Sequence, residues 1–203
     1  AVREADALLV RSATTVDAEV LAAAPKLKIV GRAGVGLDNV DIDAATERGV
    51  MVANAPTSNI HSACEHAISL LLSTARQIPA ADKTLRDGEW KRSSFSDVEI
   101  FGKTIGIVGL GNIGQRVAHI AHAMGMDISA CTSRNSSDLP EWIRKTTLEG
   151  LLSTSDVITL HCPLTAGNTR MINAGTLAMV HPGAILINTG RGGLVDEQAV
   201  AAA

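Results

Sequence analysis

The chain has 203 residues, a formal net charge of −3, 46% hydrophobic residues and 19% charged residues. This length suits one or two globular domains, and the weak negative charge gives no reason to expect nucleic acid or an anionic membrane as a partner. No apolar run reaches the roughly 18 residues that a membrane helix needs. The cysteines Cys64, Cys131 and Cys162 are far apart and odd in number, which disfavours a disulfide framework or a zinc site and favours a reducing cytoplasm.

The first quarter of the chain alternates short apolar strands with short helices. We expect strands at 7–10, 28–31 and 50–53, and helices at 17–24 and 41–48. This alternation predicts parallel strands with helices on both faces of the sheet. Turn residues at 54–58 then mark a domain boundary, so we divide the chain into residues 1–56 and residues 57–203.

The rest of the chain predicts a second α/β unit with a doubly wound parallel sheet. The expected strands are 104–109, 127–131, 157–160 and 184–187, and the expected helices are 59–76, 79–87, 115–124, 147–152, 173–179 and 195–203. The chain begins at a helix end and stops in an Ala-rich helix at Ala203. We therefore expect both ends to be cut from a longer protein.

A glycine-rich loop joins the strand at 104–109 to the helix that follows it. Its sequence G-x-G-x-x-G places glycines at Gly109, Gly111 and Gly114. The first glycine allows a tight turn, the second lets the backbone approach a pyrophosphate, and the third lets the helix pack close to the strand. The helix N-terminus offers free N–H groups to the phosphates. This order of strand, loop and helix predicts a dinucleotide site, the alternative being a glycine-rich turn without a ligand.

The end of the strand at 127–131 bears on the choice of cofactor. NAD enzymes carry an acidic residue there that binds the adenosine ribose, about 20 residues past the glycine loop. Here the positions are Thr132, Ser133 and Arg134, and Asp127 comes too early because it begins the strand. Two hydroxyls and a guanidinium would bind the 2′-phosphate that a carboxylate would repel. We therefore expect NADP in preference to NAD; the alternative is that Arg134 is a solvated loop charge.

Other polar residues follow expected strands. Arg191 lies between glycines, where a fixed cation can bind a carboxylate and polarise a neighbouring carbonyl. Arg11 and Ser12 follow the first strand and could bind an anionic substrate. The loop Gly34-Val35-Gly36 can present backbone N–H groups to an anion. Each feature also has a plainer interpretation. Arg191 could be a surface arginine, Arg11 and Ser12 a solvated pair, and the loop an ordinary turn.

The histidines give no catalytic or metal pattern. His61, His66, His119 and His122 lack the i, i+4 spacing of a helical metal site. His161 and His181 lie beside expected strands, and we interpret both as structural. We expect no metal, and no Ser-His-Asp or Cys-His arrangement is evident.

Four motifs together resemble a known family. The segments RAGVGLDNVD, NAPTSNIHSACEHA, GKTIGIVGLGNIGQ and INTGRGGLVDE are similar to those of the D-isomer-specific 2-hydroxyacid dehydrogenases, and the resemblance covers essentially the whole chain. It implies reversible hydride transfer between a nicotinamide cofactor and a 2-hydroxy acid. It also implies a Rossmann-like dinucleotide domain, a truncated flavodoxin-like substrate domain, and a homodimer with residues 79–101 as an arm.

The resemblance assigns roles to particular residues. Arg191 matches the catalytic arginine that holds the substrate carboxylate and carbonyl. Asn112 and Ile113 match the pyrophosphate loop, and Cys162, Thr189 and Gly190 match cofactor contacts. Val35 and Gly36 match the loop that meets substrate and nicotinamide. Arg11 and Ser12 match the residues on the substrate-phosphate side.

The sequence also departs from the family pattern. The family's Glu and its acid/base His come after the R-G-G-L-V-D motif, beyond Ala203, so the chain as given carries one of three catalytic residues. The first half is similar to the branch that acts on a phosphorylated hydroxy acid, which has Asp at the position of Thr132. The second half, with CTSR and LHCPLTAGNTRMIN, resembles NADP-linked glyoxylate or hydroxypyruvate reductases.

The sequence leaves two further functions as alternatives. A non-catalytic nucleotide-binding module, such as a redox-sensing corepressor, would share the dinucleotide site. A methyltransferase with a similar glycine loop is disfavoured, because it does not explain Arg191 or the Gly34–Gly36 loop.

Overall fold

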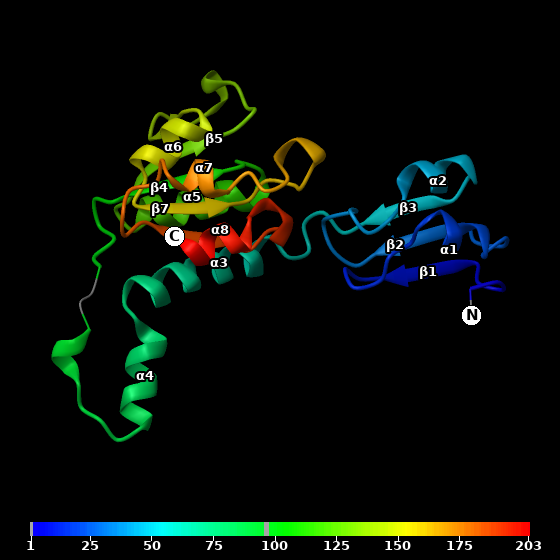
Figure 1. Ribbon diagram of the computed structural model, residues 1–203. Coiled ribbons are helices and arrows are strands. Elements are labelled where there is room, and N and C mark those ends of the chain that lie inside the picture. Colours follow the sequence, from blue (N-terminus) through cyan, green and yellow to red (C-terminus); the bar gives the residue numbers. More distant parts are fainter. Residues whose placement is uncertain (1, 96–97) are drawn as a thin grey trace. The chain divides into compact units, whose positions relative to one another are not determined.

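A computed structural model describes residues 2–95 and 98–203. The chain divides into two compact units, Ala1–Asn59 and Ile60–Ala203, each described by itself below. The strands are β1 Ala7–Val10, β2 Ile29–Arg32, β3 Met51–Asn54, β4 Thr104–Val108, β5 Asp127–Cys131, β6 Ile143–Lys145, β7 Val157–Leu160 and β8 Ile185–Asn188 (Figure 1). The α-helices are α1 Ala18–Ala22, α2 Ile42–Glu47, α3 Ile60–Ala75, α4 Ile78–Arg86, α5 Asn112–Ala123, α6 Leu148–Thr154, α7 Ala174–Leu177 and α8 Glu197–Ala202.

The first unit is a parallel sheet in the order β1-β2-β3. Leu8, Val30 and Val52 lie opposite one another in register and pack in the core with Leu21 of α1 and Ala45 of α2. The prediction of helices on both faces is wrong for this unit, because α1 and α2 contact each other over one face. The other face presents exposed apolar side chains, Leu9 and Met51.

The second unit is a five-stranded parallel sheet in the order β6-β5-β4-β7-β8. The chain builds outward from β4 to β5 and β6, then crosses back and places β7 on the free side of β4. This reversal confirms the predicted doubly wound topology, and it makes the carboxyl ends of β4 and β7 the point where such sheets bind ligands.

Two apolar cores lie on opposite faces of this sheet. On one face Ile105 and Ile107 of β4 pack against α3 and α5, through Leu71 and Val117 among others. On the other face Val108 of β4 packs with residues of α6 and β7, including Leu151 and Leu160. Residues on both faces of β4 are therefore buried, as the continuous apolar run of Thr104–Val108 predicts.

Some element bounds differ from the predicted ones. Helix α5 begins at Asn112 because Gly111 is its N-cap, so the glycine loop is shorter than expected. Strand β6 was not predicted, because it has only three residues and only Ile143 is buried. Without an apolar alternation, such a strand is identified only through its pairing with β5.

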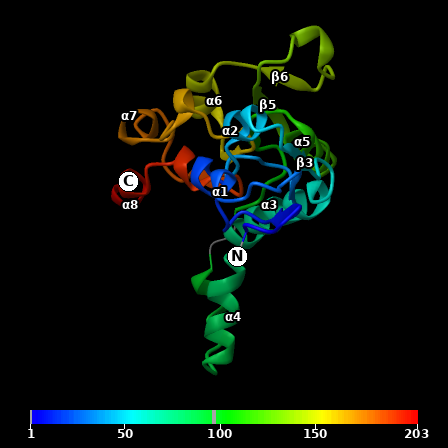
Figure 2. The same ribbon diagram turned by 90° about the vertical axis from the view of Figure 1, so that its right-hand side faces the viewer.

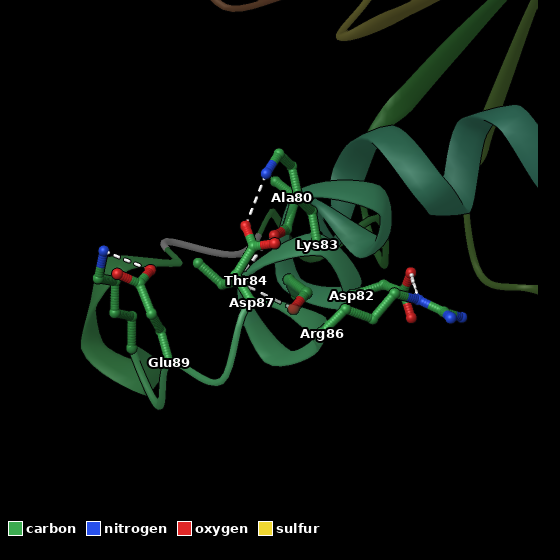
Figure 3. Close-up of polar contacts among 9 residues, drawn as sticks. Ala80, Asp82, Lys83, Thr84, Arg86, Asp87 and Glu89 are labelled. Atoms are coloured by element: carbon green, nitrogen blue, oxygen red, sulfur yellow. Dashed lines mark hydrogen bonds and ion pairs between the residues drawn. The ribbon is translucent and has the colours of Figure 1, made fainter.

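Helix α4 extends away from the five-stranded sheet of its unit and buries none of its residues (Figures 1 and 2). Ion pairs one turn apart join Lys83 to Asp87 at 2.6 Å and Arg86 to Asp82 at 2.7 Å (Figure 3). Such exposed pairs contribute about 0.3–0.5 kcal/mol each. Across the described parts of the chain, no helix combines the length and apolar character that crossing a membrane requires.

Candidate functional site

A pocket of about 430 Å³ opens at the carboxyl ends of β4, β5 and β7, where the strand order reverses. The loops after these strands line it. The pocket brings together several of the residues predicted to bind the cofactor, namely Gly109, Gly111, Thr132, Ser133, Arg134 and Cys162. The site therefore draws on three loops that are separated along the chain.

The glycines of the first loop differ in what surrounds them. Gly109 has φ +94°, and a Cβ added there would lie 2.6 Å from the backbone nitrogen of Cys162. A Cβ on Gly114 would meet the carbonyl oxygen of Gly109 at 2.1 Å. Gly111 has no such neighbour within 4 Å and faces open space. Asn112 and Ile113 form the first turn of α5 directly after it, so a diphosphate could approach the free N–H groups of this turn.

The loop after β5 is held by local hydrogen bonds. The backbone N–H of Arg134 donates to Oγ1 of Thr132 at 3.2 Å, and Nζ of Lys145 on β6 donates to the carbonyl of Arg134. Asp127 pairs with Thr104 at the opposite end of β5, away from this loop. No carboxylate forms an ion pair with Arg134 among the described residues.

The wall formed by the loop after β7 carries no charge near neutral pH. His161 lies 2.9 Å from Oγ1 of Thr159, and burial lowers the pKa of its imidazole to about 4. Burial likewise raises the pKa of the Cys131 and Cys162 thiols. Met171 contacts Cys162, with the two sulfur atoms 3.9 Å apart. Neutral sulfur-bearing side chains of this kind suit the face of an aromatic base.

Sequence reasoning did not assign several of these lining residues. Cys131, Asn168 and Met171 line the pocket, and so does His161, which we interpreted as structural. Asn168 donates to the carbonyl of Pro163 at 2.7 Å and so ties two parts of the loop together. The only sequence signal for this wall is its position directly after an apolar strand.

The residues after β8 form a separate, ordered turn. Nδ2 of Asn188 donates to the carbonyl of Arg191 at 3.0 Å, and Oδ1 of Asn188 accepts from the N–H of Gly190 at 3.0 Å. Thr189, Gly190 and Arg191 are not among the residues that line the pocket. They follow β8 at the same edge of the sheet, because all its strands are parallel.

The predicted substrate residues Arg11, Ser12, Val35 and Gly36 lie in the first unit, after β1 and β2. Asn39 donates to the carbonyl of Arg11 at 2.9 Å, and Asn54 donates to the carbonyl of Val35 at 2.7 Å. Both loops are therefore fixed through their backbone at the carboxyl edge of this sheet. In the described part of the chain, no group of three or more His, Cys, Asp or Glu side chains could hold a metal.

Fold and site together define a dinucleotide-binding domain of the Rossmann type, and the chain also contains a smaller parallel α/β unit. The chain belongs to the D-isomer specific 2-hydroxyacid dehydrogenases, because the model of that family's NAD binding domain matches residues 68–203.

Particular relatives support the assignment. The chain is 60% identical over 99% of its length to D-3-phosphoglycerate dehydrogenase of Mycobacterium tuberculosis, of which it spans 38%. It is 43% identical over 97% of its length to hydroxypyruvate reductase of Thermotoga maritima, of which it spans 64%. Among solved structures, the acyclic imino acid reductase Bsp5 in complex with NADPH and D-Arg matches with a TM-score of 0.89 and 32% identity, over 99% of this chain and 65% of that one.

Proposed function

We propose that this chain is the cofactor-binding part of a D-3-phosphoglycerate dehydrogenase, which transfers a hydride between 3-phosphoglycerate and a nicotinamide cofactor as a step of serine biosynthesis. The observation that carries the proposal is the pocket where the strand order reverses, with an open position at Gly111 and crowded glycines on either side. The 60% identity to the mycobacterial dehydrogenase supports the choice of substrate.

On this proposal the substrate is held by Arg191 together with residues of the first unit. Arg191 would bind the carboxylate and polarise the carbon–oxygen bond that reacts, as a bidentate guanidinium can. Arg11 and Ser12 would bind the substrate phosphate, and Val35 and Gly36 would contact substrate and nicotinamide. The hydrogen bonds from Asn188, Asn39 and Asn54 support these roles because they fix the loops that carry them.

We propose NADP as the preferred cofactor. The loop that would meet the adenosine ribose offers two hydroxyls and the guanidinium of Arg134, and no ion pair with Arg134 occurs in the described residues. A charge-assisted hydrogen bond contributes about 1.5–3 kcal/mol, so Arg134 should favour NADPH over NADH by roughly 10- to 100-fold. Thr189, Gly190, Asn112 and Ile113 would contribute further contacts to the cofactor.

A fluorescence titration of the chain with NADPH and NADH at fixed salt tests the cofactor assignment. We expect tighter binding of NADPH, with the preference lost in Arg134→Ala. Tighter binding of NADH would overturn the NADP assignment and leave the dehydrogenase proposal standing. If neither cofactor bound, the assignment of the pocket as a dinucleotide site would be wrong.

A hydroxypyruvate or glyoxylate reductase linked to NADP is the second candidate, favoured by the Thr132–Arg134 loop and by the relative from Thermotoga maritima. The two activities differ in whether the substrate carries a phosphate. The full-length gene product should therefore be assayed with 3-phosphoglycerate and with glycerate. A dehydrogenase of 3-phosphoglycerate should lose most of its preference for the phosphorylated acid in Arg11→Ala. Turnover of neither acid would favour a non-catalytic sensing module.

We also propose a homodimer in which residues 79–101 serve as an arm. Support comes from the apolar side chains that this segment leaves exposed, including Trp90 at 81% and Phe101 at 73%. Residues 96 and 97 of the arm lie outside the described residues. Sedimentation of the wild type and of Trp90→Glu tests the arm, because the charged variant should shift the protein to monomer.

We propose a reducing cytoplasmic location, because the three cysteines are free thiols.

A further inference from the structure

We propose that Lys145 is a second specificity-determining cation for the 2′-phosphate of NADP and acts together with Arg134. The inference rests on the proposed NADP preference, and it adds a residue from β6, the strand that sequence reasoning did not predict. The geometry behind it is the hydrogen bond from Nζ of Lys145 to the carbonyl of Arg134, which places a second positive charge beside a loop that lines the pocket.

Lys145 reaches this position because of the strand register. It is the last residue of β6 and lies opposite Ala130 of β5, and the N–H of Thr146 donates to the carbonyl of Ala130 at 2.9 Å. The side chain of Lys145 extends past the end of β5 and donates to the carbonyl of Arg134. The ammonium group is therefore fixed beside the loop that would receive the adenosine ribose.

The peptide around Arg134 is held from two directions. Its N–H donates to the hydroxyl of Thr132 at 3.2 Å, and its carbonyl accepts from Lys145. A phosphate that enters the loop would then meet the guanidinium of a residue whose backbone is fixed, and an ammonium that is already held beside it. Such preorganisation reduces the entropy lost when the ligand binds.

The charges of this corner favour a multiply charged anion. Within the described residues neither Arg134 nor Lys145 forms an ion pair with a carboxylate. Glu149 is an acidic group close to the site, since its carboxylate and Lys145 both act electrostatically on Cys131. Hydrogen bonds from its own backbone N–H and from the Thr147 hydroxyl lower the pKa of Glu149, which keeps it ionised. Because this carboxylate weakens the positive field near the loop, a second cation beside Arg134 strengthens the attraction for a phosphate.

Arg144 supplies a matched control. It precedes Lys145 on the same strand, so its side chain points to the opposite face, where it donates to Oγ1 of Thr154 at 3.1 Å. Arg144→Gln and Lys145→Gln thus change the net charge equally at neighbouring positions. Only the second change removes the cation that contacts the carbonyl of Arg134.

The test uses 2′,5′-ADP and 5′-AMP as probes, titrated calorimetrically into the chain at fixed salt. We expect Lys145→Gln to weaken binding of 2′,5′-ADP by about 5- to 20-fold and to change binding of 5′-AMP less than about 2-fold. Lys145→Arg should retain most of the affinity for 2′,5′-ADP, and Arg144→Gln should leave both probes unaffected. Thermal melting of each variant reports whether the fold is intact.

The outcomes separate this inference from the proposal on which it rests. If the wild type does not prefer 2′,5′-ADP to 5′-AMP, the NADP assignment fails and the role of Lys145 fails with it. If the wild type has the preference but Lys145→Gln weakens both probes equally, Lys145 only shapes the loop, and this inference alone is overturned. An equal loss in Arg144→Gln would also overturn it, because a general loss of charge would explain the effect.

Discussion

The carbonyl oxygen of Gly109 lies 2.1 Å from the point that a Cβ on Gly114 would occupy. Helix α5 therefore packs against the turn that precedes it at a distance only glycine allows. We expect Gly114→Ala to reduce the free energy of unfolding by about 1–3 kcal/mol, because backbone must shift to admit the methyl group. Urea unfolding measures this loss.

Gly111→Ala is the matched variant for a role in binding. No atom lies within 4 Å of its added Cβ, and the residue has φ −77°, which alanine adopts freely. We expect unchanged stability but cofactor binding weakened by roughly 10-fold or more, since the methyl group would occupy the space of the pyrophosphate. If Gly111→Ala bound cofactor as well as the wild type, the pyrophosphate would not sit at this loop.

The elements predicted well from sequence are those whose signal is local. Strand β4 is a continuous apolar run followed directly by the glycine loop, and both features are read from adjacent residues. The prediction of helices on both faces of the first sheet failed because the burial of a strand depends on elements outside it. An apolar run such as Ala7–Val10 predicts burial on both sides, yet Leu9 is 85% exposed. The run shows that the residues are apolar but not which elements cover them.

The parts of the site that escaped prediction depend on contacts between distant segments. Lys145 reaches the loop after β5 through the pairing of β6 with β5 and through a hydrogen bond to Arg134, eleven positions away in the chain. Met171 reaches Cys162 across a loop whose course is set by Asn168. No periodicity or spacing rule encodes such contacts, whereas the G-x-G-x-x-G loop carries its geometry in its own residues.

Asn188 is expected to control the turn that carries Arg191. Its amide bridges the N–H of Gly190 and the carbonyl of Arg191, each at 3.0 Å. Asn188→Ala should reduce the free energy of unfolding by about 1–2 kcal/mol, since both hydrogen bonds are lost. If Arg191 binds substrate as proposed, the same variant should lower kcat/KM of the full-length protein, with KM raised. Asn188→Asp keeps the acceptor for Gly190 and should show a smaller effect, and equal effects in both variants would contradict the bridging role.

His161 predicts a pH dependence of stability. Burial lowers the pKa of its imidazole from 6.5 to about 4, so below pH 6.5 the unfolded chain binds a proton that the folded chain does not. The contribution to stability is complete above pH 6.5 and is lost as the pH falls toward 4, by on the order of 3 kcal/mol. Urea unfolding at intervals between pH 7 and 4 should show this fall in the wild type and a shallower one in His161→Gln. Identical slopes would show that His161 is protonated as readily in the folded state as in the unfolded chain.

The three cysteines should differ in their reaction with iodoacetamide. Cys64 is 1% exposed, whereas Cys131 and Cys162 are partly buried and line the pocket. Because burial raises the pKa of both pocket thiols, we expect slow alkylation near pH 7 that accelerates as the pH rises above 9. NADPH should protect Cys131 and Cys162, and Cys64 should react only in denaturant. Mass spectrometry of peptides locates each modified thiol, and alkylation of Cys131 and Cys162 at an unchanged rate in the presence of NADPH would place the cofactor elsewhere.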